Sequence, residues 1–124
     1  MAEWRRWCRH VRDFELDDAG LTVRFTSGRK HRVSIQEEVD HYDLFAVVAR
    51  RAQLAAVDHL PERLWRLNRA TQLVSFKTDR HGRVVGTSWL PKAGLTPEEF
   101  QRAARRLAAE SDRVELLLTG KDWE

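Results

Sequence analysis

Apolar residues near the N-terminus recur with the spacing of a helix. Trp4, Trp7, Cys8 and Val11 occupy positions i, i+3, i+4 and i+7, so residues 3–12 are predicted to form an amphipathic helix. Basic side chains fall mostly on its other side. Three interpretations follow: a helix packed on the core with a solvated basic face, a helix that docks a partner chain, and a membrane-surface helix, for which the segment is short.

The next part of the chain alternates between apolar and polar residues. This period predicts a half-buried strand over 21–26, a turn at 27–30 and a return strand over 31–35. A short strand at 14–16 precedes them. The apolar, β-branched run at 42–49 indicates a central strand. Together these segments predict an antiparallel meander.

A helix and a hairpin are predicted to follow the meander. Residues 53–69 are helical in character, with Pro61 in the first turn, and 53–59 form either a loop or a separate helical turn. Strands over 72–78 and 83–90 flank a turn in which Gly82 suits a left-handed position. The side chains predicted to point inward from this hairpin are Val74, Phe76, Val85 and Trp89.

The last element has the clearest signals. Thr96-Pro97-Glu98-Glu99 is a capping box with Pro at the first helical position, and Gly120 suits a left-handed helix end. An apolar stripe with spacings of four and three lies between them: Phe100, Ala104, Leu107, Ser111, Val114 and Leu118. We therefore expect one long helix close to the sheet. The alternative is a strand over 113–118, where apolar residues also alternate.

The predicted fold class is α+β. The order α-β-β-β-α-β-β-α gives an antiparallel sheet, built from a three-strand meander plus a hairpin and packed against helices. The length of 124 residues fits a single domain over 1–124.

Composition indicates the cellular compartment of the protein and the classes of partner it can bind. The chain carries one cysteine, Cys8, so an intramolecular disulfide is excluded and a reducing, cytoplasmic location is expected. No secretory signal is expected at the charged N-terminus, and no apolar stretch is long enough for a membrane span. Net charge is only +3, with acidic and basic residues mixed along most of the chain. Strong nucleic-acid binding is therefore not expected.

No catalytic motif is present. The chain lacks a phosphate loop, a dinucleotide fingerprint, a nucleophile elbow and a zinc-protease motif. Cys8 and His10 point in different directions on a helix, and Asp40, His41 and Asp43 are interpreted as solvated residues before a strand rather than an acid–base cluster. We expect no enzyme activity, no cofactor and no metal.

Tryptophans and arginines supply the candidate binding residues. Trp4, Trp7, Trp65 and Trp89 lie within predicted elements and are expected mainly in the core, whereas Trp123 follows the last helix as a candidate interface anchor. The candidate partner-binding set comprises Trp4, Trp7, Arg5, Arg9, Arg12 and Trp123.

Two further sets of residues are considered for binding roles other than protein binding. Weak nucleic-acid binding would use the basic N-terminal helix and the first hairpin through Arg24, Arg29, Lys30 and Arg32. Asn68 and Arg69, at the end of the second helix, are expected to satisfy free helix carbonyls rather than bind a ligand.

The segment from Leu64 to Asp122 resembles the YbjN family. Three stretches carry the resemblance: LWRLNRATQLVSFKTD, RHGRVVGTSWLPKAG and LTPEEFQRAARRLAAESDRVELLLTGKD. It implies a type III secretion chaperone-like fold with no established catalytic residues. Relatives in secretion are dimeric chaperones that hold an extended client segment. The resemblance therefore implies a bacterial, chaperone-like or regulatory protein-binding module that forms a homodimer.

Overall fold

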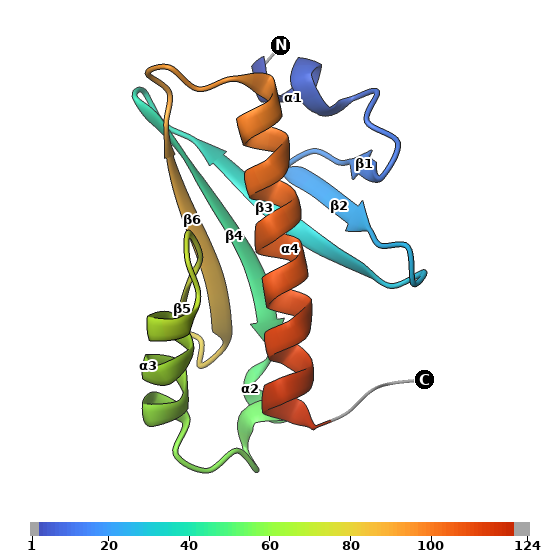
Figure 1. The fold of residues 1–124 in the computed structure, drawn as a ribbon. Helices are drawn as coiled ribbons and strands as arrows, with labels where there is room; N and C mark the ends of the chain where they lie inside the picture. The colour runs from blue at the N-terminus through green and yellow to red at the C-terminus, as the bar shows by residue number, and fades with distance from the viewer. Residues whose placement is uncertain (1–2, 121–124) are drawn as a thin grey trace.

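Figure 1 shows the fold in a computed structural model that describes residues 3–120. Over this range the chain forms α1 (Glu3–Cys8), β1 (Phe14–Leu16), β2 (Gly20–Arg24), β3 (Lys30–Glu37), β4 (His41–Ala49), α2 (Arg51–Leu54), α3 (Leu60–Ala70), β5 (Ser75–Thr78), β6 (Val84–Pro91) and α4 (Pro97–Thr119).

The strands form one antiparallel sheet in the order β1-β2-β3-β4-β6-β5. The meander β1 to β4 is followed by a hairpin whose second strand, β6, pairs with β4. Helix α4 crosses one face of this sheet (Figure 1). The α+β class is confirmed, and the predicted short strand at 14–16 makes the meander four strands long.

Helix α4 has the predicted ends. The Thr96 hydroxyl accepts a hydrogen bond from the Glu99 backbone N–H (3.1 Å), and the Thr96 N–H donates to the Glu99 carboxylate (3.0 Å). Gly120 ends the helix with φ 64°. The alternative strand over 113–118 is wrong, because the buried stripe continues through Val114 to Leu118 on one side of the helix.

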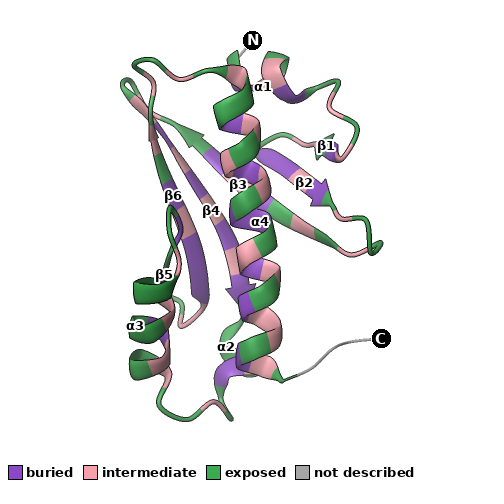
Figure 2. Ribbon diagram, viewed as in Figure 1, coloured by how far each residue is buried: buried purple, intermediate pink, exposed green. Residues whose placement is uncertain are grey.

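The buried side of α4 lies close to the sheet, as the small stripe residues predict. Ala104, Leu107 and Ser111 are fully buried, and Figure 2 shows buried residues on the side of α4 that faces the strands. Gly86 of β6 lies opposite, where an added Cβ atom would contact Ser111 and Leu107. The absence of a side chain at Gly86 allows this close approach.

Helix α1 is shorter than predicted, ending at Cys8 rather than Arg12. The chain turns after Cys8, with hydrogen bonds from Val11 N–H to Cys8 O and from Phe14 N–H to Val11 O, so that β1 can begin at Phe14. Trp4 is buried and stacks on Phe100. The apolar side of α1 therefore packs on the N-terminal end of α4.

The second helical region is divided, but the separate helical turn begins before the predicted range of 53–59 and most of that range is not helical. Residues 51–54 form α2, and α3 begins after His59, whose left-handed backbone (φ 57°) separates the two helices. Pro61 lies in the first turn of α3, as predicted.

The inward positions on the hairpin are only partly as predicted. Val74 and Phe76 lie in the core, but Trp89 is 61% exposed. The prediction assigned the wrong phase to β6: Gly86 faces α4, so Val85 and Trp89 point to the opposite face of the sheet. Val85 is nevertheless buried there.

Helix α3 shows two more departures from expectation. Trp65 is 60% exposed, under the Arg69 guanidinium at 4.8 Å. The Asn68 amide bonds the backbone of Phe76 in β5 in both directions, accepting from N–H (2.7 Å) and donating to O (2.8 Å). The expectation that Asn68 and Arg69 satisfy helix carbonyls is therefore wrong. The Leu67 carbonyl is instead satisfied by the Thr71 N–H.

Candidate functional site

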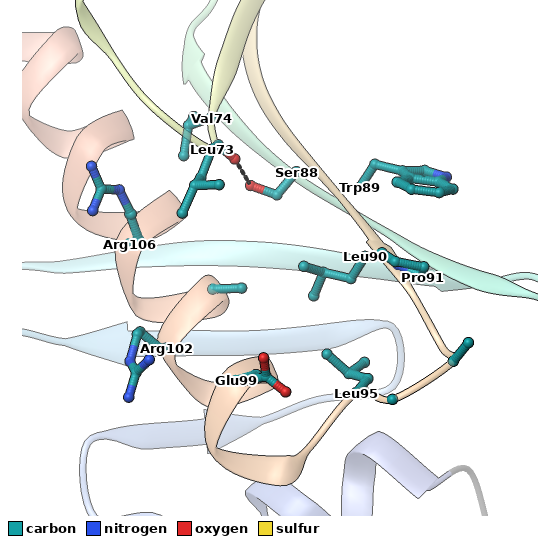
Figure 3. A pocket seen from close by; sticks show the side chains of 13 residues that line it. Leu73, Val74, Ser88, Trp89, Leu90, Pro91, Leu95, Glu99, Arg102 and Arg106 are labelled. Atoms are coloured by element: carbon teal, nitrogen blue, oxygen red, sulfur yellow. Dashed lines mark hydrogen bonds between the residues drawn. The ribbon is translucent and has the colours of Figure 1, made fainter.

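A groove lies between the C-terminal half of β6 and the N-terminal half of α4 (Figure 3). Its volume is about 330 Å3, and its wall is mainly apolar. The apolar residues that line it are Leu73, Val74, Trp89, Leu90, Pro91, Ala93, Leu95 and Ala103. Such a hollow suits one or two apolar side chains of a ligand.

The groove is open because the outer strand stops short. β5 pairs with β6 only opposite residues 84–87, so within the described chain residues 88–91 have a strand neighbour on the β4 side alone. An uncovered strand edge of this kind can accept an added strand from another polypeptide. The groove thus combines backbone hydrogen-bonding groups with an apolar wall.

Leu73 stands at the mouth of the groove in an unusual backbone conformation. Its φ is 69°, a left-handed value that costs a branched residue about 1–3 kcal/mol, and its side chain is 81% exposed. The Ser88 hydroxyl donates a hydrogen bond to the Leu73 carbonyl (2.9 Å, Figure 3) and fixes this segment against β6. An apolar side chain is thereby held in solvent at this end of the groove, where a ligand could contact it.

The rim of the groove is basic. Arg102 and Arg106 are exposed on α4 (Figure 3). Glu99 also lines the groove, but its carboxylate bonds to Thr96, and the Thr96 N–H in particular lowers the pKa of Glu99. Glu99 therefore stays ionised and offsets one of the two arginines, so the three charged side chains of the rim carry one net positive charge, which favours acidic groups.

Trp89 connects this groove to a second hollow on the opposite face of the sheet. That hollow, about 400 Å3 in volume, is lined by Phe45, Val85 and Trp89 together with charged residues of β4 and the β5–β6 turn. The Trp89 ring also lies 5.5 Å from the His41 ring. Trp89 thus contributes apolar surface to both hollows.

The residues Asp40, His41 and Asp43 are brought together. His41 Nδ1 lies 2.7 Å from Asp40 and Nε2 lies 3.1 Å from Asp43, and the bond to Asp40 raises the pKa of His41. Because both ring nitrogens are held by carboxylates, the imidazole forms an ion-pair cluster and has no nitrogen left to accept a substrate proton.

Cys8 is not placed to react. Its thiol is fully buried, and this burial raises its pKa to about 12. The nucleophilic thiolate is therefore scarce at neutral pH.

The predicted partner-binding residues of the N-terminus occupy different environments. Trp4 is in the core, and Trp7 is half-buried against Phe100 and Tyr42. Arg5 lies over the Trp4 ring and donates to the Asp17 carbonyl (2.7 Å). Arg9 and Arg12 are exposed, and Trp123 lies outside the described residues. Among the described members of this set, Arg9 and Arg12 are more exposed than Trp4 and Trp7.

The basic residues of the first hairpin are largely paired. Arg24 bonds Glu15, Arg29 forms a two-point pair with Asp112, and Arg32 does the same with Asp17. Lys30 is exposed on β3. The positive charge that this hairpin can offer to phosphate groups is accordingly reduced.

The groove between β6 and α4 was not predicted from the sequence. Trp89, which lines it, was predicted to point inward and is instead exposed.

Comparison with known proteins identifies the fold. The structure resembles SpcU, from the heterodimeric ExoU–SpcU complex of the type III secretion system of Pseudomonas aeruginosa (17% identity, TM-score 0.65, 95% of this chain and 97% of that chain), and ExsC, from the ExsC–ExsE complex (21%, 0.58, 78% and 74%). It also resembles SchA, from the HopA1–SchA chaperone–effector complex (11%, 0.54, 96% and 89%).

Two searches gave no relatives. No protein-family model and no curated protein matches the chain. Within residues 3–120, the helices are all too short or too polar to cross a membrane.

Proposed function

We propose that this domain is a non-enzymatic, chaperone-like protein-binding module. It holds an extended segment of a partner polypeptide in the groove between β6 and α4. The observation that carries the proposal is the uncovered edge of β6 at 88–91 beside an apolar groove, on a fold shared with chains from chaperone–effector complexes.

The geometry defines the chemistry of the partner segment. An added strand at residues 88–91 would direct alternate side chains into the groove, since side chains of a strand alternate between its two faces. The apolar wall favours one or two aliphatic side chains, and Arg102 and Arg106 favour an acidic neighbour. The partner is therefore an extended segment in which apolar and acidic residues are close in sequence.

The proposal is tested by selecting peptides on the full chain. A displayed library of random peptides of about ten residues, long enough to span the open edge, is selected and the recovered peptides are measured by fluorescence anisotropy. We expect enrichment of aliphatic and acidic residues, and backbone NMR shifts centred on residues 88–91 when peptide is added.

Two alanines of α4 provide matched variants. Ala103 lines the groove, whereas Ala109 is exposed elsewhere on the same helix. Ala103→Phe should fill the groove and weaken peptide binding at least about tenfold, while Ala109→Phe should leave it nearly unchanged. Equal behaviour of the two variants, or failure to select any peptide, would reject the groove as the binding site.

The proposal also covers the oligomeric state, the cellular location and the protein family of the domain. We propose that the domain acts in the cytoplasm and self-associates through the exposed Trp65 face of α3, which lies apart from the groove. Sedimentation of wild type and Trp65→Ala tests this, since loss of the tryptophan should shift the chain toward monomer. Membership of the YbjN family remains a prediction, supported by the element order from α3 to α4.

A further inference from the structure

Three side chains from distant parts of the sequence converge beside α4. His31 lies on β3, and Asp112 and Glu115 lie one turn apart on α4, where an i, i+3 spacing puts them on the same side. The distance from His31 Nδ1 to Asp112 Oδ1 is 3.7 Å, and that to Glu115 Oε1 is 4.0 Å. The three candidate ligand atoms, one from each residue, all lie within 4.8 Å of one another.

The hydrogen bond on the other side of the imidazole defines which nitrogen is available. His31 Nε2 lies 2.9 Å from the Val47 carbonyl. A carbonyl only accepts, so Nε2 carries a proton, and in the neutral ring the lone pair is on Nδ1. This lone pair faces two carboxylates from a side chain that is only 9% exposed. The three groups thus direct lone pairs toward one another, an arrangement that a cation bound between them would stabilise.

We propose that His31, Asp112 and Glu115 bind a divalent transition-metal ion that joins β3 to α4. One imidazole nitrogen and two carboxylate oxygens suit Zn²⁺ among the common ions, and a backbone carbonyl on the second imidazole nitrogen is the usual support for a histidine ligand. The present separations exceed those of bound ligands, so the carboxylates move toward the ion when it binds. The proposal is independent of peptide binding at β6.

Arg29 is compatible with this site. Its Nη2 bonds Asp112 Oδ1 and its Nε bonds Oδ2, both at 3.0 Å. An ion on Oδ1 replaces the first of these bonds and leaves the second, so that Arg29 orients the carboxylate from outside the coordination shell. The two carboxylates and Arg29 together carry one net negative charge.

The site is open to solvent at one side. His31 and Glu115 line a hollow of about 360 Å3 together with Lys30, Arg32 and other residues of β3 and β4. An ion can enter by this route, and water can complete its coordination.

Calorimetric titration of the full chain with ZnCl₂ at neutral pH tests the proposal. We expect one ion per chain, and an increase in melting temperature when Zn²⁺ is added, because an ion that binds only the folded state stabilises it. His31→Gln and Glu115→Gln should each weaken Zn²⁺ binding at least about tenfold and abolish the thermal shift. If His31→Gln does not fold, Glu115→Gln still tests the proposal, because the Glu115 side chain is partly exposed.

His41 supplies the matched control, because it is also a histidine beside two carboxylates. His41→Gln should bind Zn²⁺ as wild type does. Absence of Zn²⁺ binding by wild type up to about 1 mM would overturn the proposal, and so would unchanged affinity in Glu115→Gln.

Discussion

A Cβ atom on Gly86 would lie 2.8 Å from the Ser111 hydroxyl oxygen. The same atom would lie 3.1 Å from Leu107 and from Phe76, so β6 and α4 meet here with no room for even one methyl group. This pair therefore sets the distance between the helix and the sheet. Since α4 forms one wall of the groove and carries two of the three proposed metal ligands, both sites depend on it.

Gly86→Ala is expected to destabilise the fold by about 1–3 kcal/mol, because the added methyl group forces a close-packed interface apart. Urea denaturation measures this loss. Combining it with Ser111→Ala should recover part of the loss, since removal of the hydroxyl relieves the shortest contact. Strictly additive effects of the two substitutions would contradict this account of the interface.

Ser111→Ala alone is expected to stabilise the protein by up to about 1 kcal/mol. The Ser111 hydroxyl is buried and has no hydrogen-bond partner among the described residues, so its removal ends an uncompensated desolvation cost. Thermal denaturation followed by circular dichroism gives the comparison. Ser75→Ala, at an exposed position, should leave the melting temperature nearly unchanged. A fall in stability for Ser111→Ala would show that the hydroxyl is bonded in solution.

Leu107→Ala is expected to cost about 2–5 kcal/mol, because Leu107 is fully buried at the centre of the α4 stripe. Leu117 offers the same truncation on the same helix, but its side chain is 50% exposed. Leu117→Ala should therefore cost much less. Similar losses in both variants, measured as urea midpoints, would contradict the register of α4 against the sheet.

Local signals predicted much of this fold. The capping box at Thr96, the stripe through Leu107 and the left-handed Gly120 defined α4 nearly to the residue, since these features act within one helix. Alternation likewise predicted the meander. The small residues Ala104 and Ser111 correctly indicated close packing of the helix on the sheet.

The errors have a common physical origin in contacts between distant segments. Val85 and Trp89 were assigned to the wrong face because β6 carries apolar residues on both faces, and only its pairing with β4 and the position of Gly86 under α4 decide the phase. The groove arises from the unequal lengths of β5 and β6, which no single motif encodes. His31 and Asp112 are 81 positions apart, so spacing rules for metal ligands do not detect them.

Asp17 gives a prediction for acid conditions. Its hydrogen bonds from Arg32 (2.8 and 2.7 Å), with a further bond from the Ala19 N–H, lower the pKa of Asp17 from 3.8 to about 2. A lowered folded-state pKa stabilises the fold above the ordinary pKa, and this contribution is lost as the pH falls from about 4 to about 2. Asp17→Asn should therefore lower the urea midpoint at pH 6, and the difference from wild type should shrink toward zero near pH 2.

The exposed neighbour Asp18 controls for the loss of one negative charge on this turn. Asp18→Asn should change the urea midpoint little at either pH. A pH-independent deficit in Asp17→Asn would mean that the turn requires the carboxylate for its shape rather than for its ion pair with Arg32.

The amide of Asn68 protects one edge of the sheet against edge-to-edge pairing with a second copy of the protein. By bonding both the N–H and the carbonyl of Phe76, it occupies the free side of β5 at that residue as a neighbouring strand would. At the other end of the sheet, β1 is only three residues long. Unpaired strand edges are the usual starting points for edge-to-edge aggregation. The Asn68 side chain blocks one edge of the sheet, and β1 is short at the other. Edge-to-edge growth of the sheet is therefore restricted to the short open segment of β6 at residues 88–91.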